Sequence, residues 1–233
     1  MAVNNDGECV VRKALNMQKL KGVYSHVAKR YDLQHSIFTA GSDQRGRKIL
    51  VEKTVKAGDR VLDCGSGTGS TALLAAQKVG ATGKVNLFDL SDEMLAVAEK
   101  RAMEAGFQDR IEFQTGDMLN LPFEDNSFDA VLSTYSICPL HDPAKGALEL
   151  YRVLKPGGHI GIAHSSQPEM PLVKWLANKV EWLVWHIPSI SLGCRPVSVH
   201  SVLNQAGGKI TFEKRIGIPL WPFAVFVLEK PMI

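Results

Sequence analysis

A glycine-rich turn between two apolar runs constrains this chain more than any other feature. Residues 60–70 read Arg-Val-Leu-Asp-Cys-Gly-Ser-Gly-Thr-Gly-Ser, with glycines spaced by two. Arg60–Leu62 are typical of the end of a buried strand, and Thr71–Val79 is apolar and Ala-rich, as expected of a helix. A strand, a glycine turn and a helix in this order form the nucleotide crevice of an open α/β sheet.

The spacing of the glycines discriminates between nucleotide ligands. The pattern is G-x-G-x-G, whereas the dinucleotide fingerprint requires glycine or alanine where this chain has Ser70. Asp63 lies just before the turn, where a carboxylate can order the glycine loop or reach a cationic ligand. The turn therefore favours a nucleoside ligand without a pyrophosphate, and an adenosyl sulfonium fits it better than NAD.

Two further carboxylates follow predicted strands. Lys84–Phe88 is the second strand, and Asp89 at its end is placed to accept hydrogen bonds from ribose hydroxyls. Ile111–Thr115 is the third strand. Asp117 after it can accept the amino proton of adenine, with Met118 beside the ring.

The order of the elements predicts the fold class. The predicted strands are Arg60–Leu62, Lys84–Phe88, Ile111–Thr115, Phe128–Ser133, His159–Ala163, Lys209–Arg215 and Ala224–Glu229. Helices between the first five imply a parallel sheet, with Ser91 and Asp142 as N-caps. Only Ile216–Phe223 separates the last two strands, which therefore pair antiparallel. We expect an α/β, Rossmann-like, mostly parallel seven-stranded sheet with an antiparallel last strand and helices on both faces.

The flanking segments complete a single domain of residues 1–233. Two helices, Met17–Arg30 and Gln44–Val55, precede the first strand; they either pack on the sheet edge or fold over the ligand. We therefore expect a helical cover (1–57), a cofactor-binding core (58–164), a helical acceptor lid (165–197), and a last helix with the antiparallel strands (198–233).

Composition excludes several classes of protein. The net charge of +3 and dispersed basic residues argue against nucleic acid. The cysteines, Cys9, Cys64, Cys138 and Cys194, form no C-x-x-C pair, so neither a metal site nor a disulfide framework is expected. No signal peptide or membrane-spanning run is expected either, and the default location is cytoplasmic.

The motifs together resemble those of class I S-adenosylmethionine (SAM)-dependent methyltransferases, most closely the ubiquinone/menaquinone C-methyltransferase group. They are Val-Leu-Asp-Cys-Gly-Ser-Gly-Thr-Gly (61–69), Asp89 with Ser-Asp-Glu-Met-Leu (91–95), Gly-Asp-Met (116–118), Leu-Pro-Phe-Glu-Asp-Asn-Ser-Phe-Asp (121–129), Arg-Val-Leu-Lys-Pro-Gly-Gly (152–158) and the leading Tyr-Ser-His-Val-Ala-Lys-Arg-Tyr-Asp (24–32). The resemblance implies a methyltransferase with SAM as its cofactor.

The resemblance also implies the cofactor contacts. The corresponding positions are Tyr31, Asp63, Gly65, Ser66, Gly67, Asp89, Leu90, Asp117, Met118 and Ser133. By this correspondence Asp63 and the glycine turn contact the methionine part, Asp89 the ribose, and Leu90 the adenine. Ser133 lies beside the sulfonium, and Tyr31 closes over it.

The acceptor side carries the candidates for catalysis. Methyl transfer is an in-line displacement, and a base is needed only if the acceptor must lose a proton. Side chains after the fourth and fifth strands that suit this role are His141, Tyr135 and His164. His141 has a structural alternative, as a cap of the next helix or a solvent-facing side chain.

Residues 167–197 are distinctive. On one helical face the side chains of Leu172, Leu176, Lys179 and Leu183 recur, and tryptophans widen its apolar arc. This helix either packs on the core, forms a lid over an apolar acceptor, or rests on a membrane surface. Trp182 and Arg195 are the candidate acceptor contacts, although Arg195 can instead cap a helix starting near Pro196.

The expected function is methyl transfer to a hydrophobic small molecule, with C-methylation of a quinone-type ring as first choice. Residues 135–142, Tyr-Ser-Ile-Cys-Pro-Leu-His-Asp, differ from the quinone enzymes and are similar to phospholipid N-methyltransferases. N- or O-methylation of a lipid or other metabolite therefore stays open. A noncatalytic SAM-binding protein and an NAD-linked oxidoreductase are alternatives of a different class; Ser70 and the antiparallel end argue against the oxidoreductase.

Overall fold

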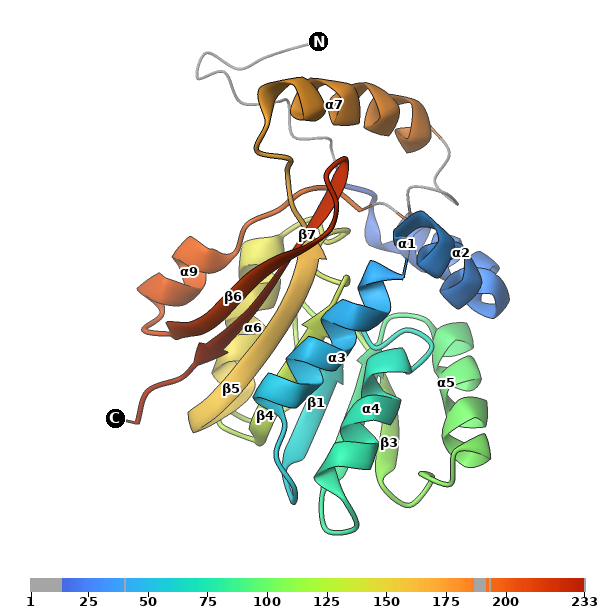
Figure 1. The fold of residues 1–233 in the computed structure, drawn as a ribbon. Coiled ribbons are helices and arrows are strands. Elements are labelled where there is room, and N and C mark those ends of the chain that lie inside the picture. The colour runs from blue at the N-terminus through green and yellow to red at the C-terminus, as the bar shows by residue number, and fades with distance from the viewer. Residues whose placement is uncertain (1–13, 40, 187–191, 193, 233) are drawn as a thin grey trace.

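The computed structural model describes residues 14–39, 41–186, 192 and 194–232, which are organised around one seven-stranded sheet (Figure 1). The strands are β1 (Arg60–Cys64), β2 (Lys84–Asp89), β3 (Ile111–Thr115), β4 (Phe128–Thr134), β5 (Leu154–Ser165), β6 (Lys209–Ile218) and β7 (Trp221–Glu229). The helices are α1 (Met17–Val27), the short 3-10 turn η1 (Ala28–Arg30), α2 (Tyr31–Thr39), α3 (Ser42–Thr54), α4 (Ser70–Val79), α5 (Asp92–Glu104), α6 (Pro143–Val153), α7 (Pro171–Trp185) and α9 (His200–Gln205).

The strand order is β3-β2-β1-β4-β5-β7-β6. β1 runs parallel to β2 and β4, and β4 runs parallel to β5. β7 inserts antiparallel between β5 and β6, with Phe226 opposite Ile162 of β5. The predicted fold class is therefore confirmed. Because the strand order reverses between β1 and β4, the carboxyl ends of these two strands open the crevice where such sheets bind ligands.

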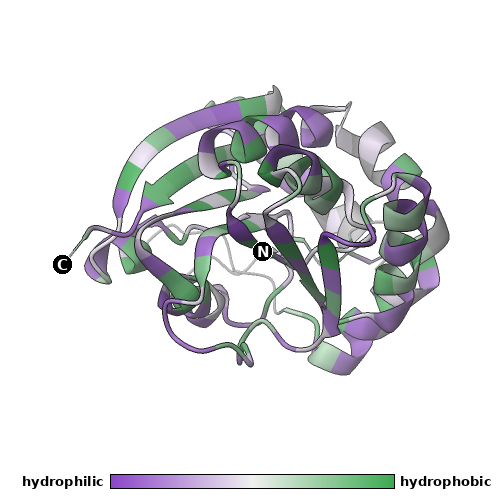
Figure 2. Ribbon diagram, turned by 90° about the horizontal axis from the view of Figure 1, so that it is seen from below, coloured by the Kyte–Doolittle hydropathy of each residue, from purple (hydrophilic) through white to green (hydrophobic). Residues whose placement is uncertain are grey.

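Helices cover both faces of the sheet. One hydrophobic cluster packs α3, α4 and α5 on one face through residues such as Leu50 and Leu87; another packs α6 and α9 on the opposite face through Leu150 and Phe226. In Figure 2 the hydrophobic colour follows the central strands, whereas the surrounding helices mix both colours. Each buried Leu or Phe contributes roughly 1.5–3 kcal/mol, so these clusters hold the strand ends in place.

Two helix starts follow the predicted capping. Ser91 Oγ accepts the Met94 N–H at 3.3 Å at the start of α5. Asp142 Oδ1 accepts the Lys145 N–H at 2.9 Å at the start of α6, where proline occupies the first turn. Both N-cap predictions are confirmed, because each side chain satisfies an N–H group that has no partner within the helix.

Several boundaries differ from the sequence prediction. The N-terminal helix ends at Val27 and continues through η1 into α2, which was not predicted. The fifth strand, which was predicted over His159–Ala163, begins at Leu154 and contains an irregularity, since Phe128 pairs with Leu154 but Ala130 pairs with His159. The last helix begins at His200 instead of near residue 196.

The predicted packing face of α7 points outward. Leu172 is 75% exposed and Leu176 47%, whereas the buried side chain is Ala177 on the opposite side. The alternative in which this face packs on the core is therefore wrong for the side chains that the structure describes; the Leu183 and Trp185 side chains lie outside them. Within the described residues, no helix is both long and apolar enough to cross a membrane.

Candidate cofactor and acceptor site

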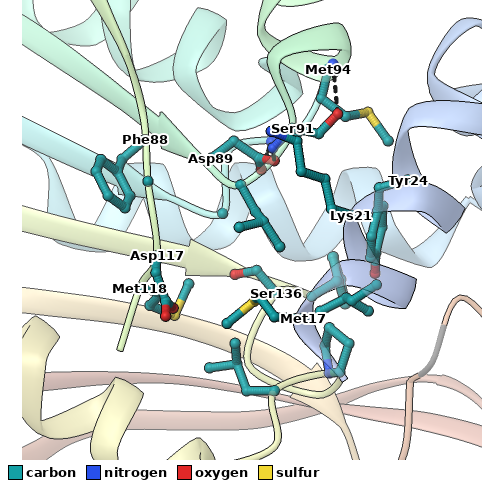
Figure 3. Close-up of a pocket in the computed structure, with 18 of the residues that line it drawn as sticks. Met17, Lys21, Tyr24, Phe88, Asp89, Ser91, Met94, Asp117, Met118 and Ser136 are labelled. Atoms are coloured by element: carbon teal, nitrogen blue, oxygen red, sulfur yellow. Dashed lines mark hydrogen bonds between the residues drawn. The ribbon is translucent and has the colours of Figure 1, made fainter. Parts of the chain in front are cut away.

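A cavity partly open to solvent lies at the carboxyl ends of the central strands, with about 660 Å³ of empty space when the part open to solvent is included. Its walls are the glycine turn, the ends of β2 and β3, the loop after β4, and α1 (Figure 3). The predicted site residues that line it are Tyr31, Gly65, Gly67, Asp89, Leu90, Asp117, Met118 and Tyr135. The structure therefore brings most of the predicted cofactor set to one cavity.

The glycine turn exposes backbone to this cavity. Gly65, Gly67 and Gly69 have φ of 69°, 53° and 78°, in the region that favours glycine. A Cβ at Gly65 would lie 2.2 Å from Ser136 Cβ, so no side chain fits there. The Gly65 N–H donates to the Phe88 carbonyl at 2.7 Å, which holds the turn against β2. A ligand can thus contact the backbone with no side chain between.

Asp89 joins the turn to the end of β2. Its Oδ2 accepts the Gly67 N–H at 2.8 Å, and its Oδ1 accepts the Ser91 N–H at 3.0 Å. Burial raises the pKa of Asp89, while backbone N–H groups of Ser91, Gly67 and Leu90 lower it. Each carboxylate oxygen keeps acceptor capacity after these bonds. The side chain is therefore able to accept hydrogen bonds from two ribose hydroxyls.

The opposite side of the cavity combines apolar surface with one carboxylate. The Phe88 ring lies so close to Gly116 that a Cβ there would be 2.3 Å from it. Met118, which is 7% exposed, lines the cavity nearby. Asp117 Oδ1 accepts the Leu119 N–H at 2.9 Å, and its second oxygen is available to an amino group of a ligand. This arrangement suits adenine.

Helix α1 supplies a wall of the cavity, although none of its residues was among the predicted site residues. Its lining residues are Met17, Leu20, Lys21 and Tyr24. Lys21 Nζ lies 2.9 Å from Asp92 Oδ2, and Ser25 Oγ donates to Glu93 Oε2 at 2.5 Å, so α1 is tied to the start of α5. The available signal was the i, i+4 pair of Leu20 and Tyr24, which lie on one face of the predicted helix Met17–Arg30.

Asp63 lies behind the cavity instead of lining it. Its side chain is 0% exposed and faces a polar cluster in which Arg47 Nη1 donates to Thr71 Oγ1 and Thr134 Oγ1, both at 2.7 Å. Burial raises the pKa of Asp63 to about 7, the Arg47 charge lowers it, and the Asp89 charge raises it. A direct contact between Asp63 and the methionine part stays a prediction.

The predicted serines also lie just behind the lining. Ser133 is fully buried, and its Oγ is 2.7 Å from the Oγ of Ser136, which lines the cavity and donates to the Cys64 carbonyl at 3.0 Å. Ser66 is buried beneath the turn. Ser136 was not predicted because a loop residue has no periodic pattern; its position after the fourth strand was the only signal.

The three candidate bases lie in different surroundings. Tyr135 lines the cavity at φ 61°, and its hydroxyl donates to the Asp43 carbonyl at 3.4 Å. His164 is 2% exposed, with Nδ1 2.9 Å from the Ser165 carbonyl, and burial lowers its pKa. His141 is exposed, and neither histidine lines the cavity. Only Tyr135 of the three reaches it.

The candidate acceptor contacts do not line the cavity either. Trp182 is 59% exposed on α7, with its ring centroid 5.0 Å from that of His186. Arg195 Nη2 donates to the Leu140 carbonyl at 2.7 Å, and Leu140 is a lining residue. Arg195 therefore supports the cavity wall through the loop after β4.

Comparison with known proteins finds relatives that are named as methyltransferases of quinone biosynthesis. It is 36% identical over 153 residues to demethylmenaquinone methyltransferase of Lactobacillus johnsonii, a match that covers 65% of this chain and 63% of the relative. It is 34% identical over 221 residues to the ubiquinone/menaquinone biosynthesis C-methyltransferase UbiE of Pseudomonas putida, covering 87% and 86%. The chain thus spans somewhat under two thirds of the first relative's length.

Solved structures agree on the fold. A SAM-dependent methyltransferase from Aquifex aeolicus aligns with a TM-score of 0.60 at 23% identity, over 92% of this chain and 98% of that one. The [4+2]-cyclase SpnF aligns with a TM-score of 0.72 at 20% identity, over 94% and 98%. The fold alone therefore does not fix the reaction.

The model of the ubiE/COQ5 methyltransferase family matches residues 12–190, so the chain belongs to this family, and the predicted cofactor, SAM, is confirmed.

Proposed function

We propose that this chain transfers the methyl group of SAM to a carbon atom of a quinone-type ring. The observation that carries the proposal is that Gly65, Asp89 and Asp117 converge on one cavity. The names of the relatives, which act in menaquinone and ubiquinone biosynthesis, support the acceptor class. When bound, SAM supplies an electrophilic methyl group, and the residues of the chain hold the two reactants in line.

The side chains around the cavity favour an acceptor that needs no strong base. Among the described lining residues, the phenols are Tyr24, Tyr31 and Tyr135, and burial raises the pKa of each. Such phenols stay protonated at neutral pH, so they donate hydrogen bonds instead of removing protons. A reduced quinone ring is already nucleophilic at carbon because its hydroxyl groups donate electron density. The proton that the ring carbon loses after the C–C bond forms is acidic enough for water to accept it. The proposed acceptor therefore matches the groups that line the site.

A two-step assay tests the proposal. Calorimetric titration with S-adenosylhomocysteine comes first, followed by labelled-methyl transfer to a reduced quinone that lacks the ring methyl, and to a phospholipid extract. Label on the quinone carbon supports the proposal, with Asp89→Ala, whose cofactor binding should be weakened, as the control for dependence on SAM. Label on the phospholipid would replace it with lipid N- or O-methylation. Binding without turnover on either acceptor would indicate a noncatalytic SAM-binding protein, and binding of a nicotinamide cofactor instead would indicate an oxidoreductase.

We assign one proposed role to each of four consecutive segments of the chain. Residues 1–57 cover the cofactor, residues 58–164 bind it, residues 165–197 form the acceptor side, and residues 198–233 complete the sheet. The α1 residues that line the cavity support the first assignment. The hydrogen bond from Arg195 to the Leu140 carbonyl supports the third, because it joins this segment to the cavity wall.

The outward face of α7 supports a peripheral membrane contact by an otherwise cytoplasmic protein. Leu172, Trp175, Leu176 and Trp182 are 75%, 58%, 47% and 59% exposed along it. Lys179 Nζ lies 5.6 Å from the Trp175 ring centroid on the same face. Exposed tryptophans beside lysine are typical of helices that rest in the headgroup region of a bilayer, and a lipid-soluble acceptor would be taken up there.

Vesicle sedimentation tests this contact. Trp175→Ala/Trp182→Ala should reduce binding to vesicles of mixed neutral and anionic phospholipid at least several-fold. Met103→Ala, which removes an equally exposed side chain on α5, is the matched control. Equal binding of the two variants would refute the role of α7, and reduced acceptor affinity without vesicles would instead support a lid.

A further inference from the structure

Helix α3 carries a buried glycine, Gly46, in its middle. A glycine inside a helix is less favourable than an alanine, because it loses more backbone freedom when the chain folds. The backbone at Gly46 is helical, so its conformation gives no reason for a glycine. The reason must therefore lie in the atoms that occupy the space beside it.

The hydroxyl of Tyr135 occupies the space beside Gly46. A Cβ at Gly46 would lie 2.4 Å from Tyr135 Oη but 3.5 Å from Cζ of the same side chain. The hydroxyl donates to the Asp43 carbonyl of α3 at 3.4 Å. Ile216 Cδ1, at 3.1 Å from such a Cβ, is the end of a flexible side chain. The oxygen of Tyr135 is therefore the atom that depends on the missing side chain, since Cζ is already at an ordinary van der Waals distance.

The Tyr135 ring has little freedom to move, except toward the cavity. Its backbone N–H donates to the Ala163 carbonyl at 2.7 Å, and its φ of 61° is one that a bulky residue rarely adopts. The Phe223 ring packs against it edge-on, with centroids 5.1 Å apart, and Arg47 Cζ lies 5.3 Å from the ring centroid. Tyr135 lines the cavity on its remaining side. A ring pushed away from Gly46 would therefore enter the cavity.

The strand order relates Tyr135 to the methyl end of the cofactor. Asp117, Asp89 and Gly65 lie at the carboxyl ends of β3, β2 and β1, and Tyr135 follows β4, the next strand in the sheet. A cofactor whose adenine, ribose and methionine parts lie over the first three in turn presents its methyl group toward β4. This step rests on the proposed function, whereas the packing of Tyr135 against Gly46 does not.

We propose that Gly46 is a positioning residue for methyl transfer, because the gap left by its missing side chain receives the Tyr135 hydroxyl and sets how far the Tyr135 ring extends into the acceptor side of the cavity. An alanine at this position would displace the ring by about 1 Å, the difference between 2.4 Å and an ordinary contact. A misplacement of about 1 Å can lower a rate by about 100-fold. The glycine turn and Asp89 lie on other strands, so acceptor turnover should change more than cofactor affinity.

A double-variant cycle in the full chain tests the proposal. Gly46→Ala should raise the KM for the reduced quinone by about tenfold or more, while the affinity for S-adenosylhomocysteine changes by less than about twofold. Tyr135→Phe removes the atom that the new Cβ would strike. In the background of Tyr135→Phe, Gly46→Ala should therefore change the KM by less than about twofold. This rescue is not expected if Gly46 serves only to let α3 pack closely.

Gly22→Ala is the matched control, because Gly22 also lies inside a helix, α1, and a Cβ there would have nothing within 4 Å. It should leave the KM unchanged and keep or raise the Tm. The proposal would be overturned by a loss in Gly46→Ala that persists in the background of Tyr135→Phe. A Gly46→Ala enzyme with the same KM as Gly22→Ala would overturn it as well.

Thermal unfolding of the same variants separates this inference from the proposed function. Gly46→Ala should lower the Tm by about 3–10 °C, and by clearly less in the background of Tyr135→Phe. A Gly46→Ala protein that does not fold, beside a double variant that does, shows the same coupling. This cycle needs no turnover, so a wild-type protein that methylates neither acceptor refutes the proposed function alone. An active enzyme in which Gly46 and Tyr135 show no coupling refutes the inference alone.

Discussion

The pH dependence of folding stability should be set in large part by Asp63. Its carboxyl is 0% exposed, and burial raises its pKa to about 7, against the lowering effect of the Arg47 charge and the raising effect of the Asp89 charge. The ordinary value in an unfolded chain is about 3.9. The folded protein therefore holds one more proton than the unfolded chain between these two values.

The sign and size of the pH effect on the free energy of unfolding follow from this difference in bound protons. Because the folded state binds the extra proton, the free energy of unfolding falls as the pH rises from about 4 to about 7, and this contribution stays level above that. Each pH unit in this range lowers the free energy of unfolding by about 1.4 kcal/mol. Between about pH 5.5 and about pH 8.5, the fall attributable to Asp63 is therefore about 2 kcal/mol.

Asp63→Asn removes the titration and keeps the shape of the side chain. Urea unfolding of the wild-type protein and the variant, followed by far-ultraviolet circular dichroism at both pH values, measures the effect. The wild type should lose about 2 kcal/mol more than the variant on going to the higher pH. Asp89 also has a raised pKa, but it is present in both proteins and cancels in the difference.

An exposed carboxyl provides the control. Asp109→Asn removes the same charge from the surface turn before β3 and should leave the pH dependence unchanged. If Asp63→Asn shows the same pH-dependent loss as the wild type, the buried carboxyl is not the group that titrates, and the reasoning fails.

Two further predictions concern the cofactor side. Asp89→Ala should weaken binding of S-adenosylhomocysteine by about 1–3 kcal/mol, since it removes the charged acceptor at the end of β2 together with its bonds to Gly67 and Ser91; an unchanged dissociation constant in calorimetry would rule out its ribose role. Gly65→Ala should abolish cofactor binding, because the new Cβ would lie 2.2 Å from Ser136 Cβ at a backbone φ of 69°. The measurement is thermal shift with and without S-adenosylhomocysteine, and a full ligand-induced shift in the variant would contradict the close approach.

Local chemistry made much of the fold predictable. Gly65, Gly67 and Gly69 have positive φ angles, which residues with a side chain rarely adopt. The side chains of Ser91 and Asp142 cap the helices that follow them. The predicted ends of strands were wrong where their hydrogen-bond partners came from a distant part of the chain. The fifth strand starts before His159 because Lys230 exchanges backbone hydrogen bonds with Gly157 and Gly158, at 2.6 and 3.0 Å.

The sequence by itself determined which segments form strands, the glycine turn and the carboxylates at the strand ends, because these depend on spacing and on backbone chemistry that are local to each motif. Only the tertiary structure decided which side chains share the cavity. It placed α1 along the cavity, kept His141 and His164 out of the lining, and turned Leu172 and Trp175 outward. Such contacts depend on how distant elements pack, which no pattern of spacing within one segment specifies.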